Sequence, residues 1–288
     1  MLAAAGAALA AAAATASLGA PRALAALEVG GQLRGFRSTH EFTAVRLSER
    51  PAAFLLRDYL TADECDALMQ EAEASGEMHA AETSGRTDAR KRCEICCLGP
   101  KSSPTVASLT KEAARLLLDE EAVRLPGAGC EDMHVLRYAE GGEFLLHYDA
   151  VSLPRCLTVL YYLNGVGSTW FPLADDERAE ELAAIGPAEM FEHASSLEPT
   201  RDGLLAAPAA PGDAVAFFNF CEDGTPDATA LHAGMPVGEG ETKWLAAHFF
   251  QAPTLIQQRV RGDEFTAAAE TARQVQQRVA QEQGQASA

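Results

Sequence analysis

The segment 144–149 reads Phe144-Leu-Leu-His147-Tyr148-Asp149 and constrains both the fold and the chemistry of this chain. Residues two apart on a β-strand point to the same face of the sheet. We therefore expect His147 and Asp149 to lie side by side, with His232 brought to them from another part of the chain. Two imidazoles and one carboxylate can occupy one face of a six-coordinate Fe(II), which leaves three positions open. These three residues are the predicted metal ligands.

The sequence around this segment predicts a series of short strands. They are rich in Val, Tyr and Phe, and turns that contain Gly, Pro or Asp separate them. The candidate strands are Met133–Tyr138, Phe144–Asp149, Leu157–Leu163, Thr169–Phe171, Ala214–Phe220 and Trp244–Phe250. This pattern predicts a mainly β fold with supporting helices and a double-stranded β-helix (jelly-roll) core.

Two supporting helices precede the strands. The first is predicted to begin at Thr61, because Thr61-x-x-Glu64 is a capping box and Cys65, Leu68 and Ala72 follow at helical spacing. The second is predicted to begin at Ser103-Pro104, because proline suits the first helical position. We expect both helices to support the sheet from outside.

The remaining segments are interpreted from composition. Residues 1–40 begin with an Ala-rich run and are interpreted as a secretory or organellar targeting segment, or alternatively as a disordered tail. Residues 30–50 fit a linker or an early strand. Residues 45–252 form the predicted domain, with 173–210 as a partly helical insertion near the site. The Gln- and Ala-rich residues 253–288 are expected to form a mostly solvated helical tail.

Charge and cysteine content exclude some functions. The 288 residues include 23 Lys and Arg against 41 Asp and Glu, for a net charge of −18. This balance argues against nucleic acid as a partner, because binding phosphates needs clustered cations. No stretch is expected to form a stable membrane span, and no motif assigns an oligomeric state. Cys93, Cys96 and Cys97 lack a second pair of ligands, so ordinary thiols or one local disulfide are favoured over a zinc site.

Several motifs together resemble the catalytic domain of the prolyl 4-hydroxylases, which are Fe(II)- and 2-oxoglutarate-dependent dioxygenases. The resemblance covers roughly Phe54 to Phe250 and is most specific over Tyr138–Asp149 and Pro211–Trp244. It implies that Fe(II) is held by the three predicted ligands, that 2-oxoglutarate is the co-substrate, and that ascorbate supports turnover.

The resemblance also implies roles for five other residues. Lys243 is expected to pair with the far carboxylate of 2-oxoglutarate, with Thr169 and Tyr138 as further contacts. A fixed cation suits a dianion that enters a partly dry barrel. Arg155 matches a family arginine that holds the substrate peptide. Phe144 stands near the substrate, where the family often has a tyrosine.

The sequence therefore predicts a dioxygenase that hydroxylates peptidyl proline, with a peptide or protein as its substrate. Because Phe144 stands where the family often has a tyrosine, one alternative stays open. It is a 2-oxoglutarate oxygenase that acts on another protein side chain or on a small molecule. A second alternative is a binding module with a degenerate site, and a third is a cupin-like structural or sugar-binding protein. Neither of these would need Lys243.

Overall fold

The computed structural model describes residues 20–83, 86–87, 91–118, 129–150, 154–221 and 225–252. The predicted tail 253–288 and residues 1–19, which contain the Ala-rich run, lie outside them. The strands are β1 (Gln32–Phe36), β2 (Glu41–Ser48), β3 (Ala53–Arg57), β4 (His79–Ala80), β5 (Glu82–Thr83), β6 (Arg86–Thr87), β7 (Glu94–Leu98), β8 (Gly129–Cys130), β9 (Met133–Tyr138), β10 (Phe144–His147), β11 (Arg155–Tyr162), β12 (Thr169–Phe171), β13 (Leu204–Ala206), β14 (Ala214–Phe218), β15 (His232–Gly234) and β16 (Lys243–Gln251). The helices are α2 (Arg22–Ala25), α3 (Ala62–Ala74), α4 (Pro104–Leu117), α6 (Ala179–Ile185), α7 (Pro187–Ser195) and the 3₁₀ turn η1 (Ala228–Ala230).

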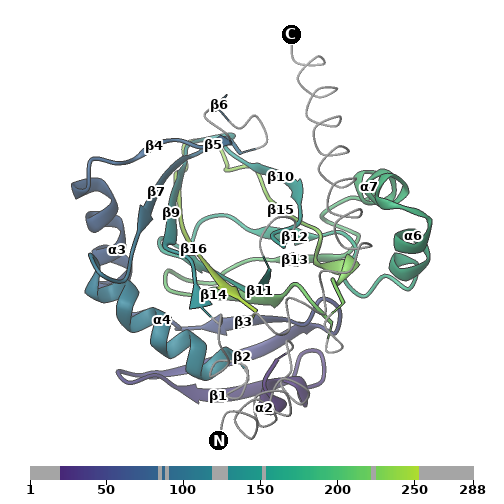
Figure 1. Ribbon diagram of the computed structural model, residues 1–288, viewed down its shortest axis with the longest axis horizontal. Helices are drawn as coiled ribbons and strands as arrows, with labels where there is room; N and C mark the ends of the chain where they lie inside the picture. The colour runs from purple at the N-terminus through teal and green to yellow at the C-terminus, as the bar shows by residue number, and fades with distance from the viewer. Residues whose placement is uncertain are drawn as a thin grey trace, which may run out of the picture.

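Two antiparallel sheets face each other and form the jelly-roll core (Figure 1). Within the described residues, the larger sheet has ten strands in the order β1-β2-β3-β14-β11-β16-β9-β7-β4, with β8 paired to the side of β16. The smaller sheet has four strands in the order β10-β15-β12-β13. The mainly β jelly-roll prediction is confirmed, and all six predicted strands are present within a few residues of their expected bounds.

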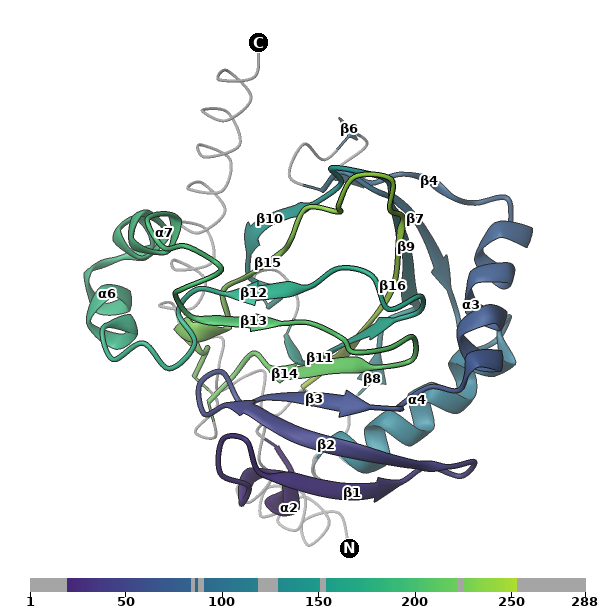
Figure 2. The same cartoon turned by 180° about the vertical axis from the view of Figure 1, so that it is seen from behind.

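The helices α3 and α4 lie together against the outer side of the larger sheet (Figure 2). Both begin where the sequence predicts. Thr61 and Glu64 form the capping box of α3, and the Ser103 side chain accepts a hydrogen bond from the backbone of Val106 at the start of α4. These side chains satisfy backbone N–H groups that have no partner inside the helix.

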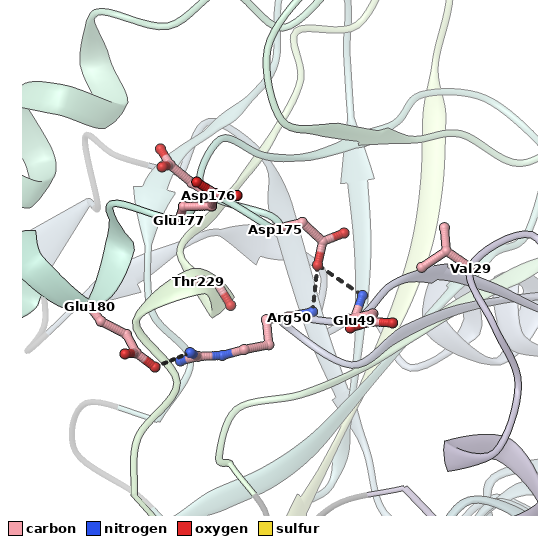
Figure 3. Close-up of a pocket in the computed structure, with 8 residues that line it drawn as sticks. All are labelled: Val29, Glu49, Arg50, Asp175, Asp176, Glu177, Glu180 and Thr229. Carbon is pink, nitrogen blue, oxygen red and sulfur yellow. Dashed lines mark hydrogen bonds and ion pairs between the residues drawn. The ribbon is translucent and has the colours of Figure 1, made fainter.

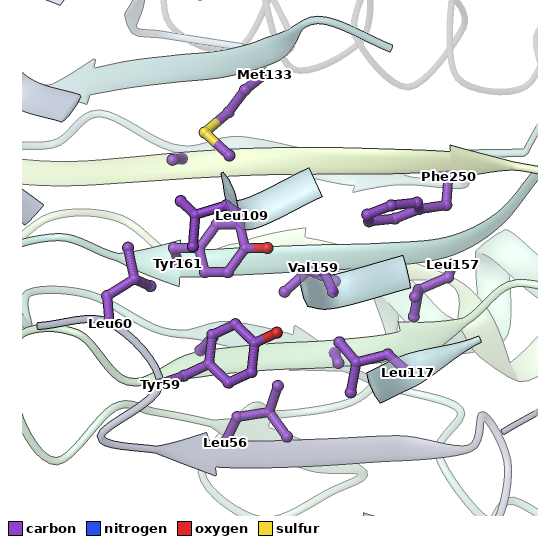
Figure 4. Packing of buried hydrophobic residues seen from close by; sticks show 14 of the residues in the cluster. Leu56, Tyr59, Leu60, Leu109, Leu117, Met133, Leu157, Val159, Tyr161 and Phe250 are labelled. Atoms are coloured by element: carbon purple, nitrogen blue, oxygen red, sulfur yellow. The ribbon is translucent and has the colours of Figure 1, made fainter. Parts of the chain in front are cut away.

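Alternation along β11 separates two hydrophobic layers. Leu157, Val159 and Tyr161 pack in the core under α3 and α4 (Figure 4), whereas Leu160 and Tyr162 pack between the two sheets. Each fully buried aliphatic side chain stabilises such a layer by roughly 1.5–3 kcal/mol. Because successive residues of a strand face opposite sides, Thr158 faces the space between the sheets together with Leu160 and Tyr162. The register shifts between Arg155 and Leu157, and Cys156 packs in the core under the helices.

The segment 173–210 carries the helices α6 and α7, which lie on the side of the molecule away from α3 and α4 (Figure 1). Their buried side chains form a third hydrophobic cluster that includes Leu173, Leu182, Phe191 and Leu231. The segment also contains β13, which pairs with β12 and so belongs to the smaller sheet.

Residues 20–40, the described part of the predicted targeting segment or tail, include a strand of the domain. Within the described residues from 20 onward, β1 pairs with β2 in the larger sheet. Arg37 follows β1 and is 1% exposed, with an ion pair of 2.6 Å to Glu64 and another to Glu112. A buried guanidinium held by two carboxylates fixes this segment to α3 and α4, so residues 30–50 are two strands of the domain rather than a linker.

All seven cysteines lie in described segments, and none forms a disulfide. Cys96 and Cys97 follow each other on β7, with Cys96 buried and Cys97 exposed. Within the described part of the chain, no helix is both long and apolar enough to cross a bilayer.

Candidate active site

Three predicted ligands meet at one end of the smaller sheet. His147 is the last residue of β10 and His232 the first of β15, and these two residues lie directly opposite each other in the antiparallel pair. Asp149 lies in the turn beyond β10, so the prediction that it sits on the strand itself is wrong. The turn nonetheless brings its oxygens to 3.6 Å from Nε2 of each histidine.

The two imidazole rings are fixed by backbone carbonyls. Nδ1 of His147 lies 2.8 Å from the oxygen of Leu145, and Nδ1 of His232 lies 2.9 Å from the oxygen of Ala230. A carbonyl only accepts, so each Nδ1 carries the proton and each Nε2 lone pair is available to a metal. Burial lowers the pKa of His232 to about 4, so this ring is neutral at neutral pH.

A relay of two buried side chains supports Asp149. Thr158 on β11 donates its hydroxyl proton to Oδ2 of Asp149 at 2.7 Å, and Asn219 donates from Nδ2 to that hydroxyl oxygen at 3.1 Å. Burial acts to raise the pKa of Asp149, but the imidazoles of His232 and His147 outweigh it and hold this pKa below its ordinary value. The carboxylate is therefore ionised at neutral pH and has one oxygen engaged by Thr158.

The donor set fits a divalent metal with open coordination positions. The ligand atoms of His147, Asp149 and His232 all lie within 4.8 Å of one another. Across the described residues, no other group of three or more His, Cys, Asp or Glu side chains comes together in this way. Two imidazoles and one carboxylate are the ligands of the facial triad of non-haem Fe(II) oxygenases.

A buried cation lies beside this cluster on the larger sheet. Lys243 begins β16 opposite Tyr138 on β9, and its side chain is 1% exposed. Its Nζ lies 5.3 Å from the ring centres of both Tyr138 and Tyr162. No carboxylate of the described residues pairs with it, and burial lowers the pKa of Lys243 to about 8. A buried ammonium surrounded by aromatic rings is suited to binding an anionic ligand.

Thr169 and Gly167 complete the surroundings of Lys243. The Thr169 hydroxyl lies 2.8 Å from the hydroxyl of Tyr162, and both side chains are buried. Gly167 lies against the lysine stem, because a Cβ built there would be 2.5 Å from Cδ of Lys243. The predicted co-substrate residues Lys243, Thr169 and Tyr138 therefore gather in the space between the two sheets.

The two predicted substrate residues occupy different surroundings. Phe144 stacks on His147 with ring centres 3.6 Å apart, directly beside the predicted metal ligand. Arg155 is held by Glu131 through two hydrogen bonds of 2.7 and 2.6 Å, and its guanidinium lies 3.8 Å from the ring centre of Phe249. The Nε and Nη2 groups of Arg155 are therefore already hydrogen-bonded to a carboxylate of the same chain.

Tyr148 links the site to the helices of the segment 173–210. Its hydroxyl donates to the backbone oxygen of Ala228 at 2.7 Å, and its ring meets that of Phe191 on α7 edge to face at 6.2 Å. Because Tyr148 stands between His147 and Asp149 in sequence, α7 packs against the same loop that carries two predicted ligands.

Thr158, Asn219 and Tyr162 contribute to the site and were not among the predicted site residues. The available signal was polarity within buried strands, since Thr158 lies in an otherwise apolar run and Asn219 directly follows Phe217-Phe218. A buried polar side chain needs a partner, but the sequence does not identify that partner.

The chain is similar in sequence and in fold to several known proteins. Residues 133–251 match the model of the 2OG-Fe(II) oxygenase superfamily. The chain is 30% identical over 223 residues to probable prolyl 4-hydroxylase 4 of Arabidopsis thaliana, which covers 71% of this chain and 70% of the relative. It is 28% identical over 224 residues to prolyl 4-hydroxylase 2 of the same plant, with the same coverage. A solved collagen prolyl hydroxylase of Paramecium Bursaria Chlorella virus-1 is 19% identical with a TM-score of 0.48, over 70% of this chain and 96% of that chain.

Proposed function

Because the chain belongs to the prolyl 4-hydroxylase family of Fe(II)- and 2-oxoglutarate-dependent oxygenases, we propose that His147, Asp149 and His232 hold its iron. The observation that carries this proposal is the convergence of one carboxylate and two correctly protonated imidazoles, with 3.6 Å between Asp149 and each ring. When bound, Fe(II) with 2-oxoglutarate supplies the oxidation of a substrate C–H bond by O₂, with succinate and CO₂ as co-products.

The protein side chains bind and orient the reactants. Lys243 is proposed to pair with the far carboxylate of 2-oxoglutarate, where Thr169 and Tyr138 contribute hydroxyl groups. Burial of Lys243 strengthens such a pair, because a charge-assisted hydrogen bond is stronger where water is excluded. Thr158 donates to Oδ2 of Asp149, the oxygen that lies 3.6 Å from Nε2 of His232, whereas Oδ1 lies 3.6 Å from Nε2 of His147. Ascorbate is proposed as the reductant that supports turnover.

Peptidyl proline is the proposed substrate, since the relatives that the chain resembles are named as prolyl 4-hydroxylases. The position of Phe144 supports the proposal that this residue lies next to the substrate, because its ring stacks on that of His147. Arg155 lies close enough to Asp149 for its Nη1 to reach the backbone oxygen at 3.4 Å. A peptide would have to share or displace Glu131 in order to use this guanidinium.

The engagement of Arg155 by Glu131 also favours a second candidate, an oxygenase that acts on another protein side chain or on a small molecule. In that case the Arg155–Glu131 pair would present a carboxylate as well as a cation to the substrate. Such a pair suits a ligand with a hydrogen-bond donor in addition to an acceptor.

The two candidates are separated by one assay on the full chain. Purified protein is supplied with Fe(II), 2-oxoglutarate, ascorbate and a pool of proline-rich peptides, and succinate and added oxygen are measured by mass spectrometry. Peptide-stimulated succinate together with hydroxyproline supports the prolyl hydroxylase proposal. Succinate without a modified peptide would reject peptidyl proline and retain the oxygenase.

The ligand assignment is tested by Asp149→Ala, with Asp66→Ala on the exposed face of α3 as the matched control. Loss of Asp149 removes the only anionic ligand of the triad, so succinate formation should be abolished. Asp66→Ala should retain it. Full activity of Asp149→Ala would overturn the assignment.

A further inference from the structure

Arg50 connects three separate segments of the chain. It stands between β2 and β3, at a cavity of about 570 Å³, and it is the one basic side chain among the described lining residues (Figure 3). Its backbone N–H and that of Glu49 donate to Oδ1 of Asp175 at 2.8 and 2.9 Å. Its guanidinium donates to Glu180 on α6 and, at 3.2 Å, to Oδ1 of Asp227.

The contact with Asp227 is the buried one. The Asp227 side chain is 4% exposed, whereas that of Glu180 is 76% exposed. An exposed ion pair contributes little to stability, because water and salt screen it. A buried carboxylate that loses its cation is left without charge compensation, which is strongly unfavourable. Arg50 therefore acts mainly on Asp227.

Asp227 in turn shapes the short segment that leads to His232. Its Oδ1 accepts hydrogen bonds from the backbone N–H and the hydroxyl of Thr229, at 3.0 and 2.6 Å, and so caps η1. Its backbone oxygen accepts from the N–H of Ala230 at 3.1 Å. The oxygen of Ala230 then accepts from Nδ1 of His232 at 2.9 Å.

We propose that Arg50 is a positioning residue for His232, which acts through Asp227 and the η1 turn to fix the carbonyl that orients the imidazole. The inference rests on the proposed function in one respect, because it takes His232 to be a metal ligand. Arg50 touches neither the metal site nor the co-substrate pocket. Its guanidinium is linked to His232 through Asp227 and residues 228–230, and the N–H of Asp227 also donates to the oxygen of Asn219 at 3.0 Å.

The test compares three variants of the full chain. Arg50→Gln removes the charge beside Asp227. Glu180→Gln removes only the negative charge of the exposed partner. Ser48→Ala is the matched control for the same turn, since it deletes the 2.6 Å hydrogen bond from the buried Ser48 hydroxyl to the oxygen of Pro51 without touching Asp227. Hydrogen exchange of the peptide that spans 227–234 is followed by mass spectrometry, and Co(II) affinity is measured by calorimetry.

Arg50→Gln is expected to accelerate exchange at Thr229 and Ala230 and to weaken Co(II) binding about ten-fold, the scale typical of residues that support metal ligands. Glu180→Gln should match the wild type in both readouts. Ser48→Ala should lower the melting temperature while leaving exchange in 227–234 and Co(II) affinity unchanged. These combined results would support the positioning role.

Two results would overturn the inference. One is unchanged exchange of 227–234 in Arg50→Gln. The other is an equal acceleration of exchange of 227–234 in Ser48→Ala. That result would show that any loosening of the turn between β2 and β3 accelerates exchange in 227–234, whether or not the contact with Asp227 is lost. Failure of the proposed function would appear in the wild-type protein as absence of Co(II) binding, and the exchange comparison would still decide the role of Arg50.

Discussion

Replacing Lys243 by Met should make the protein more stable at neutral pH while abolishing its binding of 2-oxoglutarate. Lys243 is 1% exposed, and among described residues it has aromatic rings rather than a carboxylate around its ammonium group. The side chain is thus held charged in an apolar space until an anion arrives. Methionine has a similar length and flexibility without the charge, so it fits the same space.

The expected gain follows from the pKa of this lysine. Burial lowers it from 10.5 to about 8. At about 1.4 kcal/mol for each factor of ten in the protonation equilibrium, this difference corresponds to about 3 kcal/mol. Attraction to the rings of Tyr138 and Tyr162 offsets roughly 0.5–2 kcal/mol of this penalty. Lys243→Met should therefore raise the free energy of unfolding by between about 1 and 3 kcal/mol.

The gain has a defined dependence on pH. Below about pH 8 the lysine is charged in both the folded and the unfolded chain, so the full burial penalty is present. Between about pH 8 and 10.5 the folded form loses its proton first, and the penalty declines. Above that range the lysine is neutral in both forms and the penalty is absent. Urea unfolding of wild type and variant at pH 7, 9 and 10.5 measures this trend.

Lys101→Met is the matched control, because Lys101 is exposed and carries no burial penalty. Its free energy of unfolding should stay within about 0.5 kcal/mol of the wild type. Added 2-oxoglutarate with Co(II) should stabilise the wild type further but not Lys243→Met. Lower stability of Lys243→Met at pH 7, or equal stabilisation of both proteins by 2-oxoglutarate, would refute the reasoning.

Three further perturbations test neighbouring parts of the site. Thr158→Val removes the 2.7 Å hydrogen bond to Asp149 and should weaken Co(II) binding by about 10- to 100-fold in calorimetry, whereas unchanged affinity would contradict the relay. Gly167→Ala would place a Cβ 2.5 Å from the Lys243 stem. The KM for 2-oxoglutarate should therefore rise, while the KM for the second substrate should not change. A rise in both KM values would indicate a general distortion of the site instead. Raising the pH from 7 to 9 should weaken binding of 2-oxoglutarate roughly ten-fold, because the Lys243 pKa of about 8 leaves about a tenth of the molecules protonated. Equal affinity at the two pH values would show that the lysine charge is not used.

Much of the core and of the site could be predicted because local patterns specify them. The alternation of β11 and β16 assigns each residue to one face of a strand, and the two helix starts carry complete capping signals. The cluster of His147, Asp149 and His232 was expected from the spacing of His147 and Asp149 and from the surrounding motifs, which resemble a known family of metal enzymes. These features depend on neighbours in sequence or on general chemistry.

The features that could not be predicted depend on partners far apart in the chain. Residues 30–50 fitted a linker or an early strand, and the pattern did not explain Gly35. This glycine lies in β1 opposite Phe42, whose ring would lie 2.2 Å from a Cβ at that position. A glycine is required here because the ring of its cross-strand neighbour leaves no room for a side chain, and not because the chain turns. The engagement of Arg155 by Glu131 and the relay from Asn219 to Thr158 likewise join residues that only the folded sheet brings together.

The two faces of β11 have a consequence for how the sequence can vary. Leu157 and Val159 pack in the helix-covered core, while Thr158 between them holds the carboxylate of Asp149. The backbone of the strand is common to both faces, so a change of side-chain volume in the core displaces the hydroxyl as well. Substitutions at Leu157 and Val159 should therefore alter melting temperature and metal affinity together. The choice of side chains at these two core positions is thus constrained by the hydrogen bond from Thr158 to Asp149 on the opposite face of the strand.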